Sequence, residues 1–183
     1  SNADIAIGPQ VAFDPVKFLG EVDEARREFG YNGRIMISER VGVLLEHHKL
    51  IDELRERDSG SSVGSTKQGI GPFYEDNARR TTRITFADYV SNRFPDVLRR
   101  VLGLKSAELD SLGINREDFI GRLEATHSSV REELRGFATR LEYRMAEYLK
   151  DGHHIIIEGA QGTGLDVDMG TIPDQTSSHL LAQ

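Results

Sequence analysis

The sequence contains no cysteine, and this absence excludes two classes of site. Without cysteine the 183-residue chain has no disulfide framework and no metal site built from thiolates. It also lacks any apolar run approaching the ~18 residues that a membrane-spanning helix needs. The absence of cysteine does not decide the redox compartment. Because no secretion-signal pattern is present, we expect a cytoplasmic protein.

Positive charge is also in short supply. Lys and Arg number 23 against 30 Asp and Glu, which gives a net charge of −7. This balance argues against nucleic acid held on a broad basic face, although a local anion pocket stays open. Hydrophobic residues at 38% and charged residues at 29% are typical of a globular protein with ample polar surface. The length suits one large domain or two small ones.

The N-terminal part predicts a strand, a helix and a further strand. Residues 4–13 hold two apolar stretches around a Gly-Pro pair, which is typical of strand, turn and strand. Asp14 and Pro15 suit the N-cap and first position of a helix, and Gly30 suits its C-cap. Residues 34–38 form another short apolar run, so the order predicts a right-handed βαβ unit with a parallel sheet. The stripe expected on the buried side of the helix is Phe18, Val22, Ala25 and Phe29.

A second amphipathic helix is predicted over residues 41–57. His47 and His48 lie within it as neighbours. A metal pair on one helical face needs i, i+4 spacing, whereas adjacent side chains point apart. We therefore interpret both histidines as structural or surface residues rather than as metal ligands.

Residues 86–150 are predicted to be largely helical. Short helices are expected first, with Pro95 at the start of the second one. Asn115 suits an N-cap, from which a long helix is expected to run to Tyr148 before Gly152 ends it. Its apolar stripe is more typical of a core or a subunit interface than of a ligand site.

Residues 64–80, GSTKQGIGPFYEDNARR, combine glycines with hydroxyl and cationic side chains. Ser65 and Thr66 supply hydroxyls, and Lys67 and Arg79 supply positive charge. Backbone amides and hydroxyls hold a phosphate well, and arginine adds bidentate hydrogen bonds. The segment is not a Walker A loop, because no Lys-Ser/Thr follows the second glycine of a G-x-x-x-x-G. From these residues alone, a phosphate-binding loop and an ordinary charged surface loop are equally open.

The C-terminal stretch, residues 153–178, joins a short apolar run to a polar, glycine-rich loop. Ile155, Ile156 and Ile157 predict a buried strand of a parallel sheet. Ligands bind beyond the carboxyl ends of such strands, so we interpret the loop as a binding site. The alternative is a tight strand-to-helix connection with no ligand. We expect Asp166 and Asp168 to fix the loop through backbone hydrogen bonds rather than to hold a metal.

Two motifs resemble those of one enzyme family. E-G-A-Q-G-T, followed by L-D-x-D-x-G-T and T-S-S, resembles the nucleotide-binding segment of adenylosuccinate synthetases, and residues 64–80 resemble a second hallmark of that family. The resemblance implies an α/β fold like that of P-loop NTPases, with a mostly parallel sheet, flanking helices and a largely helical insertion over about residues 86–150. Residues 4–183 would then be the central part of one nucleotide-binding domain. Residues 1–3 look like a remnant of a purification tag.

The resemblance also implies a function. Adenylosuccinate synthetases are ligases of purine biosynthesis that join IMP to L-aspartate, using GTP and Mg2+. They phosphorylate the purine 6-oxygen, and the aspartate amine then displaces that phosphate. By motif position, the residues implied to bind IMP are Thr66, Arg79, Gln161, Leu165 and Thr176. Arg79 is implied to reach the phosphate held by the partner subunit of a homodimer.

The same resemblance implies that parts of the active site lie elsewhere. The family's glycine-rich N-terminal loop and its catalytic histidine have no counterpart here, so we expect a central fragment with no catalytic residue, no Mg2+ ligand and no activity alone. Gly164, Ile172 and Asp174 depart from the residues common in the family, which leaves the base specificity open. A 2-aminoadenylosuccinate synthetase acting on dGMP is therefore an alternative. A non-catalytic nucleotide-binding or scaffold module is another, and ATP remains possible as the donor in place of GTP.

Overall fold

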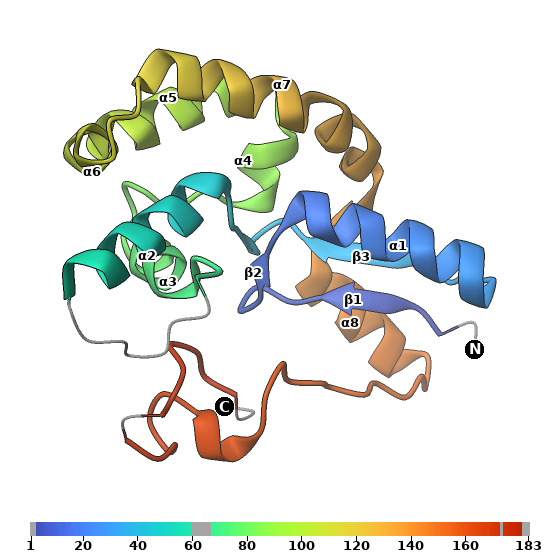
Figure 1. Ribbon diagram of the computed structural model, residues 1–183. Helices are drawn as coiled ribbons and strands as arrows, with labels where there is room; N and C mark the ends of the chain where they lie inside the picture. Colours follow the sequence, from blue (N-terminus) through green and yellow to red (C-terminus); the bar gives the residue numbers. More distant parts are fainter. Residues whose placement is uncertain (1–2, 60–66, 173, 181–183) are drawn as a thin grey trace. The chain divides into compact units, whose positions relative to one another are not determined.

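The computed structural model describes residues 3–59, 67–172 and 174–180. The chain divides into two compact units, Ser1–Thr139 and Arg140–Gln183, and each is described by itself. Figure 1 shows the order of the elements along the chain.

The first unit contains two small parallel sheets. β1 (Ile5–Ile7) pairs in parallel with β3 (Ile35–Ser38), and β3 pairs in parallel with β5 (Ala138–Thr139), which gives the order β1-β3-β5. β2 (Ala12–Phe13) and β4 (Gly42–Val43) form the second parallel pair. The predicted parallel α/β architecture is therefore confirmed.

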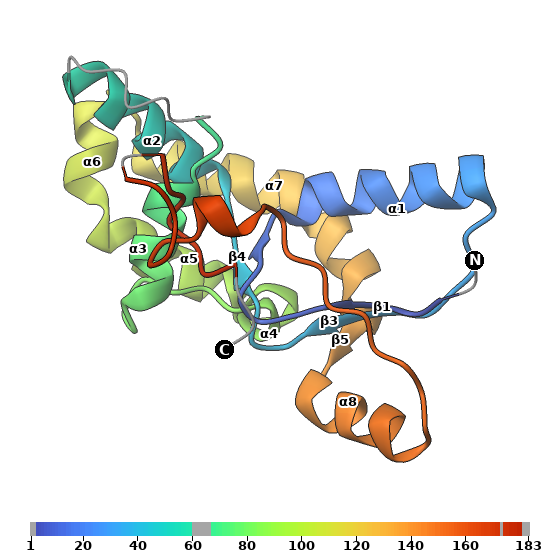
Figure 2. The same cartoon turned by 90° about the horizontal axis from the view of Figure 1, so that it is seen from below.

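The helix α1 (Pro15–Phe29) connects the two sheets and covers one face of β1 and β3 (Figure 2). The predicted caps are confirmed, because the Asp14 side chain accepts a hydrogen bond from the Lys17 amide at 3.1 Å and Gly30 has φ +61°. The buried stripe is wrong at Phe29, which is 80% exposed. A 15-residue helix is about 22 Å long, so its last turn extends beyond strands of three or four residues.

The second predicted helix begins later than expected. Residues 41–45 are buried and contain β4, and α2 runs over Glu46–Ser59. The apolar run before Glu46 is continuous rather than helix-periodic, which suits a buried strand. The segment predicted as a loop also becomes a helix, α3 (Ile70–Ala78). Pro72 lies in its first turn, where a missing N–H costs nothing.

Four further α-helices follow in the described part of the first unit, and the helix start predicted at Pro95 is confirmed to within one residue. They are α4 (Phe86–Val90), α5 (Phe94–Leu104), α6 (Ser106–Ser111) and α7 (Arg116–Leu134). α7 packs against α1, α4, α5 and α6 (Figure 1). The Asn115 cap is confirmed by a 3.1 Å hydrogen bond from the Asp118 amide.

The long helix predicted to reach Tyr148 is wrong. After α7 the chain forms a 3-10 turn (Arg135–Phe137) and then β5, and α8 (Leu141–Lys150) begins only afterwards. Two residues of β5 hydrogen-bond to β3, so sheet pairing outweighs the helical periodicity. The predicted end of the helix is confirmed, because Gly152 has φ +80°.

The second unit consists of α8, a 3-10 turn (Thr163–Leu165) and irregular chain. The buried strand predicted at Ile155, Ile156 and Ile157 is wrong. These side chains are 40%, 93% and 83% exposed, and the residues form no strand. A β-branched run becomes a strand only when another strand supplies its hydrogen bonds, and no described strand pairs with it. No helix in the described part of the chain is long and apolar enough to cross a bilayer.

Candidate functional site

The helix α2 supports the segment that leads into α3. The Gly69 amide donates to the Asp52 carboxylate at 2.9 Å. Gly69 has φ +77°, and a Cβ atom there would lie 2.7 Å from the Lys49 nitrogen and 2.8 Å from the His48 carbonyl carbon. Only glycine permits this close approach of the two backbones. Thr66 lies outside the described residues, so its implied contact with IMP stays a prediction.

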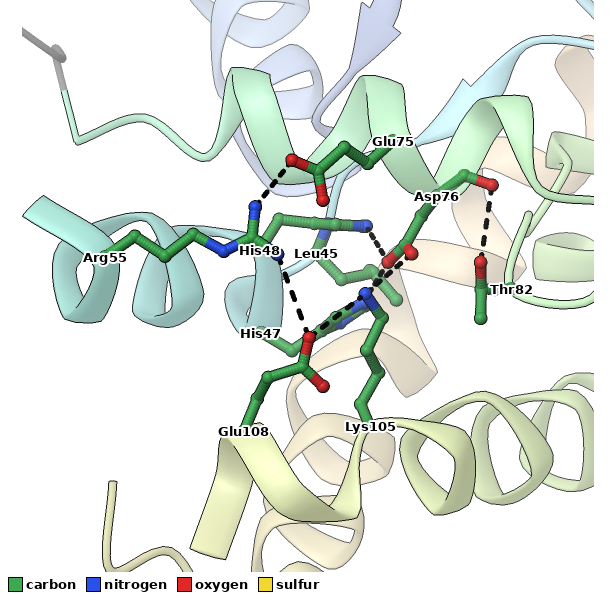
Figure 3. Close-up of polar contacts among 9 residues, drawn as sticks. All are labelled: Leu45, His47, His48, Arg55, Glu75, Asp76, Thr82, Lys105 and Glu108. Atoms are coloured by element: carbon green, nitrogen blue, oxygen red, sulfur yellow. Dashed lines mark hydrogen bonds and ion pairs between the residues drawn. The ribbon is translucent and has the colours of Figure 1, made fainter. Parts of the chain in front are cut away.

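A buried carboxylate, Asp76 of α3, joins three parts of the first unit (Figure 3). The Lys105 ammonium nitrogen lies 2.7 Å from its Oδ1, and His48 Nε2 lies 3.5 Å from its Oδ2. His48 Nδ1 accepts a hydrogen bond from the Leu45 amide at 3.0 Å, so the proton of the neutral ring lies on Nε2 and faces Asp76. All three side chains are at most 5% exposed.

This pairing keeps the carboxylate charged. Burial alone raises the pKa of Asp76, but the hydrogen bonds from His48 and Lys105 outweigh burial and lower the pKa to about 2. The resulting stabilisation is present above the ordinary pKa of 3.8 and is lost as the pH falls towards 2. Removing Lys105 alone would leave a buried charge without its partner, at a cost of ~3–5 kcal/mol.

His47 lies beside this pair. Its ring centroid is 3.9 Å from that of His48, and it is fully buried. Neither ring nitrogen has a hydrogen-bond partner among the described residues. Burial, together with the neighbouring His48, lowers its pKa well below 6.5, so the folded protein holds His47 neutral. Both histidines are buried, as a structural role requires. The expectation that these adjacent side chains point apart is wrong, because the two rings pack together beside Asp76. That neither histidine is a metal ligand stays a prediction.

Arg79 leaves the C-terminal end of α3 with its backbone fixed. Its amide donates to the carbonyls of Asp76 at 3.1 Å and Glu75 at 3.2 Å, and its own carbonyl accepts from the Arg83 amide at 3.1 Å. The side chain is exposed, and its guanidinium has no ion pair with any described residue. An arginine held in this way presents a positive charge to an anion from outside the unit.

The loop of the second unit is organised by Asp166, which is 1% exposed. Its Oδ1 accepts from the amides of Asp168 at 2.9 Å and Met169 at 3.0 Å, and its Oδ2 accepts from the Leu180 amide at 2.6 Å. The expectation that Asp166 fixes the loop through backbone hydrogen bonds is therefore confirmed. The same expectation is wrong for Asp168, whose side chain lies on the surface, 3.3 Å from His179.

Two of the implied IMP-binding residues meet in this loop. The Thr176 amide donates to the Leu165 carbonyl at 2.8 Å, and both side chains are half-buried. The Thr176 hydroxyl lies 2.7 Å from that of Ser178. Gln161 is exposed at the start of the loop. Arg79 belongs to the first unit, so the described contacts bring together Leu165 and Thr176 alone.

Among the residues that the structure describes, two groups of side chains have metal-ligand composition, and neither fits Mg2+. The first is His47, His48 and Asp76, with candidate ligand atoms within 4.8 Å of one another. His48 Nε2 carries the proton there, Lys105 occupies the carboxylate, and Mg2+ prefers oxygen ligands.

The second group is Asp166, Asp168 and His179. Both Asp166 oxygens already accept backbone amides, and only Asp168 offers a further carboxylate. We derive no chemistry through a metal at either place.

A family model described as adenylosuccinate synthetase matches residues 1–183. This chain belongs to the adenylosuccinate synthetase family. The adenylosuccinate synthetase of Alkaliphilus metalliredigens is 35% identical over 179 residues, which cover 94% of this chain and 41% of that protein. That of Chlorobium limicola is 36% identical over 181 residues, covering 94% and 40%. The chain therefore spans about two-fifths of the length of these relatives.

A solved structure supports the fold. The fully ligated adenylosuccinate synthetase from Plasmodium falciparum superposes with a TM-score of 0.75 at 23% identity, over 97% of this chain and 41% of that one. This likeness shows the P-loop-like α/β fold of the family.

Sequence reasoning missed the partner of Asp76 within this adenylosuccinate synthetase segment. Lys105 and Asp76 lie in different helical regions, and neither stands in a motif that marks a buried pair. The one available signal is that Lys105 directly follows the apolar end of α5. A lysine at such a position is buried only when a carboxylate pairs with it.

We predict that the neutral state of His47 makes the fold sensitive to mild acid. Below pH 6.5 the unfolded chain takes up a proton at His47 while the folded chain does not. The free energy of unfolding therefore decreases by up to about 1.4 kcal/mol for each unit by which the pH is lowered. Urea unfolding between pH 8 and 5 should show this loss in the unaltered chain and less of it in His47→Phe. His154→Gln, at an exposed position, should follow the unaltered chain. Parallel curves for the unaltered chain and His47→Phe would contradict the prediction.

We also predict that Asp166→Ala opens the loop of the second unit without unfolding the first. It removes a charged acceptor from three amides, each bond being worth ~1.5–3 kcal/mol. Hydrogen exchange should lose protection at Asp168, Met169 and Leu180 and keep it in β3. Asp168→Ala is the matched control and should change little. Equal protection in both variants would show that Asp166 does not hold the loop.

Proposed function

We propose that this chain carries part of the IMP site of an adenylosuccinate synthetase, the GTP-dependent ligase that joins IMP and L-aspartate in AMP biosynthesis. The single observation that carries the proposal is the exposed Arg79 guanidinium, which has a fixed backbone and no ion-pair partner in the described part of the chain. A nucleoside monophosphate supplies the doubly charged anion that such a group binds. Family membership supports IMP as that nucleotide.

The residues implied to bind IMP would make different contacts with it. In the first unit, Arg79 and Thr66 would bind the phosphate. In the second, Gln161 would reach the purine next to its reacting oxygen, Leu165 would line the base pocket, and Thr176 would contact the phosphate. The loop held by Asp166 gives Leu165 and Thr176 a defined backbone, because the Thr176 amide donates to the Leu165 carbonyl.

The chemical role we assign to these residues is binding and orientation. The reaction requires the purine 6-oxygen to be phosphorylated and then displaced by the aspartate amine, and developing charge at that oxygen must be stabilised. A hydrogen bond from Gln161 to the oxygen would contribute to this. We assign no proton transfer to any residue of the chain. We expect the Mg2+ ligands outside the described residues, since neither candidate group fits, and a cytoplasmic location stays a prediction.

We further propose that the active protein is a homodimer in which Arg79 completes the phosphate site of the partner. Arg79 is exposed, and its guanidinium has no ion pair with the described residues of its own unit. A second chain could then use it without any change in the fold of the first.

The binding test uses the 183-residue chain and IMP in a calorimeter. Loss of a hydrogen bond to a charged group costs ~1.5–3 kcal/mol, so Arg79→Ala and Gln161→Ala should each weaken binding about tenfold or more. Arg80→Ala removes an adjacent exposed arginine and is the matched control. Unchanged affinity in Arg79→Ala and Gln161→Ala would refute the assigned roles. Tighter binding of dGMP than of IMP would instead support the 2-aminoadenylosuccinate alternative.

Subunit mixing tests the dimer. Residues 4–183 replace the matching part of the full-length Alkaliphilus metalliredigens relative, and the unaltered hybrid serves as the activity reference. Arg79→Ala and Gln161→Ala hybrids, each nearly inactive, should recover about a quarter of the reference activity when mixed, because half the dimers are mixed and each has one intact site. If mass analysis confirms exchange and activity stays at the level of the single variants, Arg79 acts within its own chain.

A further inference from the structure

Asp76 makes polar contacts through both its side chain and its backbone carbonyl. Its side chain points inward to Lys105 and His48 (Figure 3). Its backbone carbonyl accepts from the Arg79 amide at 3.1 Å and from the buried Thr82 hydroxyl at 3.5 Å. The residue that is anchored in the core is therefore also the one that holds the backbone of Arg79.

A second ion pair fixes the preceding residue. Glu75 lies 2.6 Å from Arg55 of α2, and Arg55 lies 3.8 Å from Glu108 of α6. Glu108 is in turn 3.7 Å from Lys105. The Glu75 carbonyl is the other acceptor of the Arg79 amide. Both backbone contacts of this amide thus belong to residues whose side chains lead back to Lys105.

The cluster of His47, His48, Asp76 and Lys105 could be a metal centre or a structural anchor, and the hydrogen bonds decide between the two. A metal centre at His47, His48 and Asp76 would need an unprotonated His48 Nε2, which would place the ring proton on Nδ1 against the Leu45 amide. The buried ammonium of Lys105 adds a positive charge at the same carboxylate. The cluster is therefore built to hold α3 rather than a cation.

We propose that Lys105 and Asp76 are positioning residues for Arg79, and that they set the affinity of the protein for the phosphate of its nucleotide. The inference rests on the proposed role of Arg79 in binding IMP. α3 has nine residues, and the last turn of so short a helix frays unless it is anchored. With the anchor, the guanidinium starts from one backbone position, so less conformational freedom is lost when a phosphate binds.

Hydrogen exchange on the 183-residue chain tests the positioning directly. Lys105→Met should speed exchange of the Arg79 and Arg83 amides at least tenfold while the β3 amides keep their protection. Asp76→Asn combined with Lys105→Met leaves no buried charge behind, and it gives the same measurement if the single variant unfolds. Arg99→Met is the control, because it breaks a 3.0 Å pair with Glu124 that does not involve α3.

A double-mutant cycle in IMP affinity separates positioning from general loss of structure. Lys105→Met should weaken IMP binding at least fivefold in the unaltered chain and have no further effect in Arg79→Ala. Equal IMP affinity of the unaltered chain and Arg79→Ala would overturn the proposed role of Arg79. Unchanged exchange at Arg79, or equal weakening by Lys105→Met in both backgrounds, would overturn the positioning.

Discussion

The ion pair between the Asp76 carboxylate and the Lys105 ammonium group fixes α3, the helix of the first unit that ends at Arg79. Both groups are nearly out of contact with water, so neither tolerates the loss of the other. His48 adds a neutral donor from α2, and the contact of Gly69 with the same helix fixes the other end of the segment. α3 is therefore held at both ends against α2, and the position of Arg79 follows from that. Hydrophobic packing alone would not specify this orientation, because it is non-directional.

The second unit is also held by a buried carboxylate, but the partners of this carboxylate are backbone amides. Asp166 accepts the backbone amides of Asp168, Met169 and Leu180. Amide dipoles that converge on one carboxylate hold an irregular chain without regular secondary structure, and the backbone of Thr176 is further fixed by its hydrogen bond to Leu165.

The features that were predictable from the sequence are those decided by neighbouring residues. The caps of α1 at Asp14 and Gly30 depend on local hydrogen bonds, and so does the role of Asp166. The break after α7 was not predictable, because β5 forms only through pairing with the distant β3. The pairing of Lys105 with Asp76 was not predictable for the same reason, because it joins residues that are distant in the sequence. For the site, the motifs identified the family and pointed to Arg79. The contacts that hold Arg79 join residues that are far apart in the sequence, and no periodicity of the sequence indicates them.

The exposed isoleucines of the second unit bear on how this protein behaves in concentrated solution. Ile156 and Ile157 are 93% and 83% exposed within a β-branched run. Exposed backbone without a strand partner can pair with a strand of another molecule, and β-branched side chains favour such pairing. The net charge of −7 opposes such association by repulsion, but only within a Debye length of about 10 Å at 0.1 M salt. Added salt therefore shortens the range of the charge repulsion between molecules and leaves the exposed isoleucines unchanged. Colloidal stability is greatest at low ionic strength.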